Sequence, residues 1–389
     1  MSGNVIIRVM AKQKPSSQRH IDSPEDLLYA QLSVIADPRR QKSVIYPLRD
    51  VLFIALCAML SGAEAFTEFQ DFGDTREDWL KERMDLENGP PSHDTFRNVF
   101  ALVAPEQFNQ FFIRWTQGLC KHEGAEVIAI DGKSLRGSSK TQAVHLVNAW
   151  ACENNLILGQ LKTDKKSNEI TAIPALLKQL AIKGSIITID AMGTQKEIAR
   201  EVDDAGASYV FSLKKNHPKL FKEVCNLMDK PGGEQESDYF ESTETGHGRS
   251  EVRRHWITAD IGSLIHGEEW AGLCSVGKIQ RVRKVQGEES TTEEHYYLCS
   301  IEADASLLAT CARKHWEVEN KLHWTLDVTF GEDACQVRED TAATNLSLLR
   351  KMALNVLRHD KSKGSMRAKR KRAGWNVGFL EEILGFTHA

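Results

Sequence analysis

The chain has 389 residues, of which 41% are hydrophobic and 27% charged, and its formal net charge of −4 excludes a wholly basic nucleic-acid coat. This length allows two or three domains, each with its own core, and the longest apolar run, residues 51–60, is too short to span a membrane, so we expect no membrane partner. The first 20 residues lack a signal-peptide pattern and the eight cysteines show no zinc-like spacing, which together predict a cytoplasmic protein with reduced thiols.

The N-terminal part of the chain has a helical pattern. Residues 1–20 carry cations and no acid, and we expect them to form a flexible basic arm. Apolar residues then recur at three- and four-residue spacing over 48–60. Ser92 can cap a further helix, and another fits 105–119. We therefore expect an all-helical domain over residues 21–120.

The pattern changes at Gly124 to three strand-like runs followed by alternating helices and strands. The expected elements are strands at 127–131, 143–151 and 156–162, a helix at 169–180, a strand at 185–190, a helix at 194–205 and a strand at 209–213. This order predicts an α/β fold, a ribonuclease-H-like mixed sheet flanked by helices, in which the first strand lies beside the fourth.

The rest of the chain completes this predicted domain. Residues 234–300 are polar with short alternating runs, which indicates a β-rich insertion. Helical periodicity resumes at Ala305 and continues through Asp360, so the core domain would comprise 124–233 and 301–360. A basic C-terminal tail is expected over 361–389, either solvated or in contact with a phosphate backbone.

Two apolar, β-branched runs each end on an aspartate, Asp131 and Asp190. Such runs without polar alternation are typical of strands buried on both faces, so each carboxylate emerges at the carboxyl edge where α/β sheets bind ligands. Each aspartate could simply cap the turn that follows its strand. Two carboxylates on neighbouring strands could also hold divalent cations side by side.

A third acidic candidate lies far downstream. On a helix, His315, Glu319, His323 and Asp327 follow one another at i+4 and form a slowly drifting stripe. Glu317 and Glu319 point to roughly opposite sides, so only one of them can face the sheet edge. Glu319 shares its stripe with two histidines and is therefore our choice.

Other interpretations of this helix stay open. A His-x3-Glu-x3-His ladder could be a zinc or di-iron ligand set, although the chain has no second Glu-x-x-His and no His-Glu-x-x-His motif. The helix could also be purely structural, with Trp316 and Trp324 packed in a core. Trp316 or His323 could alternatively stack on an extruded base.

Several motifs together resemble the H-repeat-associated proteins of Rhs elements, within the insertion-sequence transposases of the DDE type. They lie at residues 37–39, 61–63, 91–95, 129–136, 165–170, 188–193, 213–216 and 315–324. The resemblance covers nearly the whole chain after residue 21. It implies a helical transposase-associated domain, a ribonuclease-H-like core and a β-insertion before the glutamate-bearing helix.

The resemblance also implies a function. It makes Asp131, Asp190 and Glu319 the catalytic and metal-binding triad, with Mg²⁺, or alternatively Mn²⁺, as cofactor. The expected reaction is two-metal DNA cleavage at element ends and strand transfer into target double-stranded DNA, by a homodimer that acts in the bacterial cytoplasm at the nucleoid. Many related transposases carry Tyr-x2-Arg-x3-Glu-x6-Lys, and this chain has Ala312, His315 and Leu326 at the places of the helpers.

Cations and polar residues near the triad are candidates for DNA contact. Those after strands or near the glutamate are Lys133, Arg136, Lys214, Arg313, His315, Trp316, Asn320 and Lys321. Lys133, Arg136 and Lys214 could equally well be ordinary surface residues without a role in DNA contact.

Two other functions fit the same residues. The chain could be a transposition-inactive DNA-binding remnant, or a ribonuclease-H-like metal nuclease without strand transfer. A P-loop is excluded because Val127 occupies the place of its first glycine, and the chain has no G-x-S-x-G elbow of a serine hydrolase.

Overall fold

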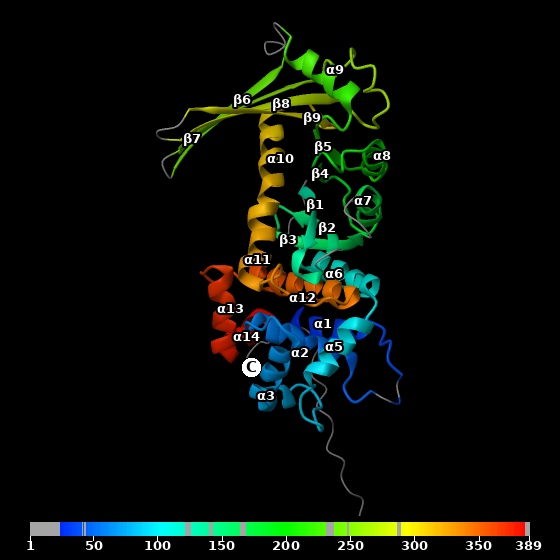
Figure 1. Cartoon of the computed structure of the whole chain (residues 1–389), viewed down its shortest axis with the longest axis vertical. Helices are drawn as coiled ribbons and strands as arrows, with labels where there is room; N and C mark the ends of the chain where they lie inside the picture. Colours follow the sequence, from blue (N-terminus) through cyan, green and yellow to red (C-terminus); the bar gives the residue numbers. More distant parts are fainter. Residues whose placement is uncertain are drawn as a thin grey trace, which may run out of the picture.

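In a computed structural model of the protein, a helical domain and a sheet domain lie at opposite ends of an elongated molecule, with helix α12 (Asp340–His359) between them (Figure 1). The structure describes residues 24–40, 42, 44–120, 126–139, 143–163, 169–230, 237–246, 249–285 and 289–385. The predicted basic arm, 1–20, lies outside these residues. Among the described residues, no helix is both long and apolar enough to cross a membrane.

The N-terminal domain is built around one buried helix, α2. Its helical elements are α1 (Pro24–Gln31), η1 (Leu32–Val34), α2 (Leu48–Leu60), α3 (Phe66–Thr75), α4 (Glu77–Lys81), α5 (His93–Leu102) and α6 (Pro105–Leu119). Nearly every residue of α2 is buried, because the helix is enclosed by its own domain and by α12. The Ser92 hydroxyl accepts a hydrogen bond from the backbone N–H of Thr95, as expected for the cap of α5.

The second domain contains one mixed sheet. Its first half comprises β1 (Val127–Leu135), β2 (Val144–Ala151), β3 (Leu156–Thr163), α7 (Glu169–Leu177), β4 (Ile186–Ile189), α8 (Lys196–Asp204) and β5 (Ser208–Leu213). β1 pairs antiparallel with β2 and parallel with β4, and β4 pairs parallel with β5. The predicted ribonuclease-H-like order is confirmed, and the first strand lies beside the fourth as expected.

The insertion extends this sheet instead of forming a separate layer. It contains α9 (Pro218–Met228), β6 (Asp238–Gly246), β7 (Arg249–Thr258), β8 (Ser275–Val285) and β9 (Thr291–Cys299). Because β9 pairs with β5, the described strands form one nine-stranded sheet in the order β3-β2-β1-β4-β5-β9-β8-β7-β6. α7, α8 and α9 cover one side, α10 (Ala305–Glu317) runs along the other, and β6 and β7 overhang beyond it (Figure 1).

The C-terminal helices connect the two domains. They are α10 (Ala305–Glu317), η5 (Val318–His323), α11 (Trp324–Phe330), α12 (Asp340–His359), α13 (Met366–Trp375) and α14 (Val377–Leu384). The helical run expected from 305 to 360 is interrupted at Gly331, whose φ of 59° is left-handed and ends α11. Residues 366–384, expected within a basic tail, instead form α13 and α14. Two of their cations, Lys369 and Arg370, are buried against the rest of the protein.

Candidate active site

The two predicted aspartates stand in adjacent strands. Ile130 of β1 is the parallel partner of Ile189 of β4, so Asp131 and Asp190 follow in matching register. β1 continues beyond this point and pairs Asp131 with Asn148 of β2. Asp190 also caps its turn, because its Oδ1 accepts hydrogen bonds of 3.1 Å from two backbone N–H groups, those of residues 192 and 193.

Negative charge converges on Asp131. Burial, together with the charges of Asp190, Glu169 and Glu319, raises the pKa of its carboxyl to about 7. The charge of Glu317, in contrast, acts on the Cys152 thiol. Of the two candidate glutamates, Glu319 is therefore the one in electrostatic reach of Asp131, and a cation at this point would relieve the repulsion.

Two contacts hold the glutamate-bearing helix in register with β1. His323 Nδ1 lies 3.5 Å from Asp131 Oδ2, and Lys133 Nζ lies 2.7 Å from both carboxylate oxygens of Asp327. Two residues along a strand advance about 6.6 Å. Four residues along a helix advance about 6 Å, so the two contacts match in spacing. Glu319, one turn before His323, belongs to the same stripe.

The stripe reaches β4 at its other end, where His315 Nδ1 lies 3.0 Å from Thr188 Oγ1. In a regular α-helix each i+4 step rotates about 40° too far, so such a stripe drifts off one face. Here η5, which carries Glu319, is a π-helical segment with more residues per turn, and this counteracts the drift. Burial lowers the pKa of His315, and lowers that of His323 to about 3, so neutral histidines flank the glutamate.

The donor chemistry of the site suits a hard divalent cation. Asp131, Asp190 and Glu319 supply only carboxylate oxygens, the ligands that Mg²⁺ prefers. Nearby, the buried Nε2 of His323 has no hydrogen-bond partner within the described residues. As the side chains lie, no three His, Cys, Asp or Glu of the described chain are grouped closely enough to hold an ion. Binding one therefore requires rotation of at least one carboxylate, and the exposed side chain of Glu319 has room to rotate.

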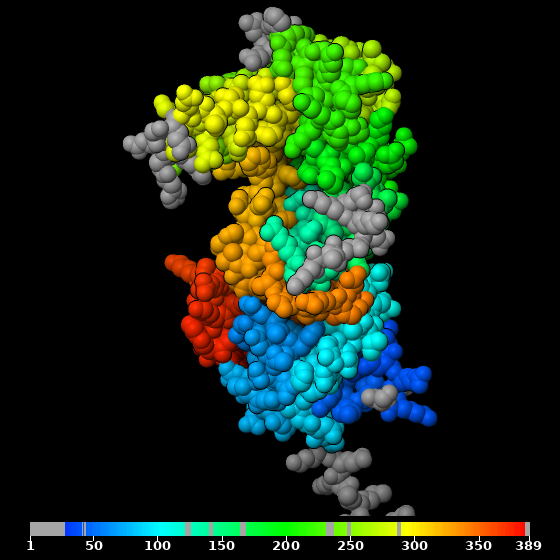
Figure 2. All heavy atoms as spheres, viewed as in Figure 1, coloured from blue at the N-terminus to red at the C-terminus, as the bar shows by residue number. Residues whose placement is uncertain are grey.

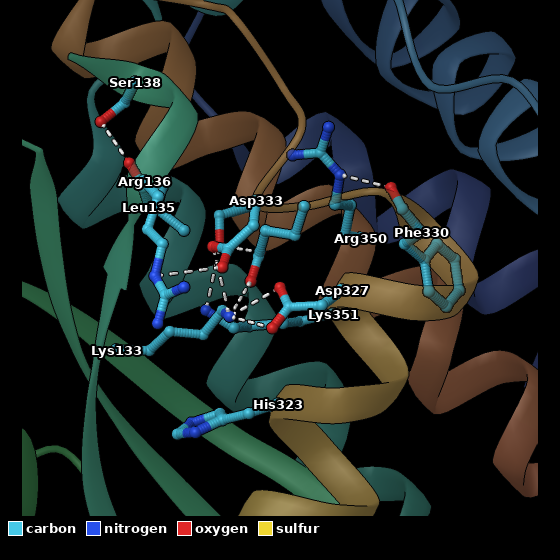
Figure 3. A network of polar contacts seen from close by, with 12 residues as sticks. Lys133, Leu135, Arg136, Ser138, His323, Asp327, Phe330, Asp333, Arg350 and Lys351 are labelled. Carbon is cyan, nitrogen blue, oxygen red and sulfur yellow. Dashed lines mark hydrogen bonds and ion pairs between the residues drawn. The ribbon is translucent and has the colours of Figure 1, made fainter. Parts of the chain in front are cut away.

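Lys133 lies in an internal network and not at a DNA-facing surface (Figure 3). Its side chain is only 8% exposed, and beyond Asp327 its ammonium lies 3.5 Å from Asp333 and 3.9 Å from Glu332. Arg136 points into the same group, 3.5 Å from Asp333, but its own side chain is 83% exposed. The predicted phosphate contact of Lys133 would thus compete with an existing ion pair, whereas Arg136 is accessible.

A buried pair beside Asp131 was not anticipated as part of a site. Glu169 hydrogen-bonds His145 Nε2, and His145 Nδ1 lies 2.8 Å from Ser134 Oγ. Both Glu169 and His145 are almost fully buried, on the opposite side of β1 from the stripe. A Cβ at Gly132 would lie 2.3 Å from Glu169 Oε1, so this approach needs glycine. The glycine directly after Asp131 was the available sequence signal.

Two adjoining cavities lead from the carboxylates to the space beneath the insertion. One of about 120 Å³ is lined by Asp190, Lys214 and Trp316, among others. The other, of about 360 Å³, lies between α10 and strands β7 and β8, and Trp316 and Asn320 line it. Trp316 is 44% exposed, with the Arg281 guanidinium 5.0 Å from its ring centre. Figure 2 shows this flank as a recess, with the insertion above it and α13 at its lower edge.

The other predicted DNA contacts are engaged within the protein. Arg313 pairs with Glu244 of β6 at 2.6 Å, although its side chain is half exposed. Lys321 pairs with Glu317 at 2.7 Å. The structure therefore brings Lys214, Arg313, Trp316 and Asn320 to the recess. Arg313 and Lys321 already have anionic partners.

Comparison with known proteins shows what the chain is similar to. A family model described as Transposase DDE domain matches residues 122–356, and one described as DDE_Tnp_1-associated matches residues 29–116. The H repeat-associated putative transposase YhhI of Escherichia coli (strain K12) is 40% identical over 369 residues, 92% of this chain and 97% of that protein. The Inactive transposase YbfQ of the same strain is 42% identical over 72 residues, 18% of this chain and 86% of that protein. A cryo-EM structure of a piggyBac transposase synaptic complex with hairpin DNA aligns with 96% of this chain and 84% of that one, at 12% identity and a TM-score of 0.42.

Proposed function

Because the chain belongs to the family of DDE-domain transposases, we propose that it cuts DNA at the ends of a mobile element and joins those ends to target DNA. The observation that carries the proposal is geometric: Asp131 and Asp190 follow in register on adjacent parallel strands, and the segment that carries Glu319 is held to those strands by the contacts of His315 with Thr188 and of His323 with Asp131. Mg²⁺ or Mn²⁺ is the proposed cofactor, since carboxylates supply its preferred oxygen ligands.

Asp131, Asp190 and Glu319 would hold the ions. When bound, divalent ions would supply activation of the attacking oxygen and stabilisation of the leaving one. Asp131 would be the central ligand, because its strand pairs with β4, which leads to Asp190, and its carboxylate lies 3.5 Å from His323 in the segment that carries Glu319. His323 and the Lys133–Asp327 ion pair would keep the Glu319 turn beside β1. The protein itself thereby orients the ligands and the scissile phosphate.

Double-stranded DNA would enter along the recess beneath the insertion. Lys214, Trp316 and Asn320 line the cavities there, and Arg136 is exposed at the end of β1. We propose that these four contact DNA directly. Of the remaining candidates, Arg313 and Lys321 would first have to exchange their carboxylate partners for phosphates.

Lys133 and His315 would act indirectly, by holding β1 and β4 to the helix. A homodimer is proposed for the complex that pairs two element ends, since paired ends call for two equivalent sites. The proposed location is the bacterial cytoplasm, at the nucleoid.

The test measures DNA cleavage. The substrate is labelled double-stranded DNA that contains the ends of the mobile element encoding the chain, together with the sequences flanking each end. Asp131→Asn, Asp190→Asn and Glu319→Gln should each abolish Mg²⁺-dependent nicking while leaving the melting temperature close to that of the wild type. Glu317→Gln is the matched control, because it removes a carboxylate two residues from Glu319 that pairs with Lys321 instead. Nicking that survives Asp131→Asn would remove the proposal.

The products separate the alternatives. A transposase yields element ends covalently joined to target DNA, whereas a metal nuclease yields only cut DNA. A DNA-binding remnant binds without nicking at any Mg²⁺ or Mn²⁺ concentration. The remnant is worth testing because the carboxylates do not form a ready ligand group among the described residues and one relative is named an inactive transposase.

A further inference from the structure

The positively charged residues of segment 361–372, which includes most of α13, fall into two sets, one buried or hydrogen-bonded within the protein and one exposed. Seven of the twelve residues from 361 to 372 are Lys or Arg. Three of them are built into the protein: Lys369, Arg370 and Arg372. The other four are exposed, and none is ion-paired within the part of the chain that the structure describes: Lys361, Lys363, Arg367 and Lys371. A disordered tail would show no such division.

Lys369 and Arg370, two of the cations that are built into the protein, attach α13 to both domains. Arg370 donates to the backbone carbonyls of Met59 at 2.9 Å and Ala63 at 2.7 Å, at the C-terminus of α2. It also donates to the carbonyl of Thr329, near the end of α11. Lys369 lies 2.8 Å from the Asp360 carboxylate. Because the C-terminal carbonyls of a helix attract cations, these contacts hold α13 rigidly beside the glutamate-bearing helix.

The exposed cations of α13 lie in a row along the helix, and the fold does not need them for its own stability. Arg367, Lys371 and Trp375 follow one another at i+4, and Trp375 is 78% exposed. Like charges at this spacing repel each other and weaken a helix. Exposed like charges that are rigidly mounted and unpaired with acids are suited to an anionic partner.

The position of this row of cations indicates which anionic partner it would bind. α13 packs against α11 and forms the lower edge of the recess (Figures 1 and 2). On α11, Trp324 is 59% exposed and Val328 49% exposed, so cations and apolar side chains lie on neighbouring helices. A duplex presents phosphates and sugars, which suit both kinds of side chain.

We propose that α13 and the segment just before it bind the DNA backbone: Lys361 and Lys363 before the helix, and Arg367 and Lys371 on it, contact the phosphates of a duplex whose scissile end reaches Asp131 and its companions. The proposal rests on the proposed function for the DNA partner. It adds a second, sequence-independent contact area, separate from the cavities next to the carboxylates. DNA would therefore be held at both edges of the recess.

The test compares the salt dependence of binding to a duplex of arbitrary sequence, about 30 base pairs long, which suffices because backbone contacts do not depend on sequence. Each phosphate contact contributes about 0.9 to the slope of log K against log salt, so Arg367→Gln/Lys371→Gln should reduce the slope by about 1.8. Between 50 and 200 mM salt the wild type should then lose about 12-fold more affinity than the variant, from 4 raised to the power 1.8.

The matched control removes two exposed cations from another helix, with Lys219→Gln/Lys222→Gln on α9, which lies across the sheet from α10 (Figure 1). Its slope should stay at the wild-type value. When the duplex is shortened from one end until it no longer reaches α13, the wild type and the α13 variant should show the same salt slope.

An unchanged slope in Arg367→Gln/Lys371→Gln, with wild-type binding intact, would overturn the α13 proposal and leave the proposed function standing. A change in the monomer–dimer equilibrium without a change in slope would assign the surface to a second copy of the chain, and also overturn it. Absence of any duplex binding by the wild type would overturn both proposals.

Discussion

Mutating the ion pair between Lys133 and Asp327 would test whether it positions the acidic residues. The pair links β1 to the helical residues His315, Glu319, His323 and Asp327. Lys133 is 8% exposed and Asp327 30% exposed, and the ammonium lies 2.7 Å from both carboxylate oxygens. Burial raises the pKa of Asp327 although Lys133 lowers it, and the charges of Asp333 and Glu332 also raise it, so the attraction to Lys133 is outweighed. Such a pair adds little stability compared with apolar side chains, and its main effect is to fix geometry.

Removing one partner and removing both should therefore have different effects. Asp327→Asn leaves the buried Lys133 with carboxylates only at 3.5 and 3.9 Å. The expected loss is about 3 kcal/mol of unfolding free energy. Lys133→Met/Asp327→Leu should recover most of that stability. It still lacks the register contact, and a shift of Glu319 by about 1 Å should slow cleavage about 10²-fold.

The assay pairs chemical unfolding with single-turnover cleavage of labelled duplex over a range of Mg²⁺ concentrations. The control ion pair is Lys162–Asp340, also 2.7 Å long, which joins β3 to α12. Lys162→Met/Asp340→Asn should leave the cleavage rate and its Mg²⁺ dependence unchanged. Wild-type cleavage by a stable Lys133→Met/Asp327→Leu protein would refute the argument from register.

Three further changes test the packing around the site. Lys351→Met should lower the unfolding free energy by about 3 kcal/mol, because it removes one of the two cations near buried Glu332, the other being Lys133, and adding Glu332→Gln should restore most of the loss in urea denaturation. Gly132→Ala should cost about 1–3 kcal/mol in the same experiment, since its Cβ would meet Glu169, and it should also slow cleavage by displacing the strand. Arg370→Met should lower the melting temperature, because buried carbonyls lose their donor at about 1–3 kcal/mol for each group left unsatisfied; an unchanged melting temperature would contradict the anchoring of α13.

The sheet and two of its acidic residues could be predicted because their signals are local. Apolar β-branched runs that end on Asp131 and Asp190 mark buried strands, and the order of elements makes those strands neighbours. Helical spacing also separated Glu319 from Glu317. In each case the relevant property, local periodicity or the order of elements along the chain, can be read without knowing any tertiary contact.

The remaining features depend on partners far away in the chain. Lys133 has the sequence surroundings of a surface lysine, and its burial follows from Asp327, 194 residues later. The basic segment around Lys369 and Arg370 has a weak helical pattern, yet it folds because carbonyls of α2, α11 and α12 accept its hydrogen bonds. No local periodicity encodes such acceptors, so the sequence alone suggested a tail.

The division of the carboxylates between strands and helix has a mechanistic consequence. Asp131 and Asp190 are fixed by sheet hydrogen bonds and, for Asp190, by the turn it caps. Glu319 instead lies exposed in the π-helical segment, between the contacts of His315 and His323 to the sheet. Those contacts fix both ends of the turn and leave its middle side chain free to rotate. Under the proposed function, Glu319 would therefore be the side chain that moves on ion binding, while Asp131 and Asp190 keep their places at the ends of the strands.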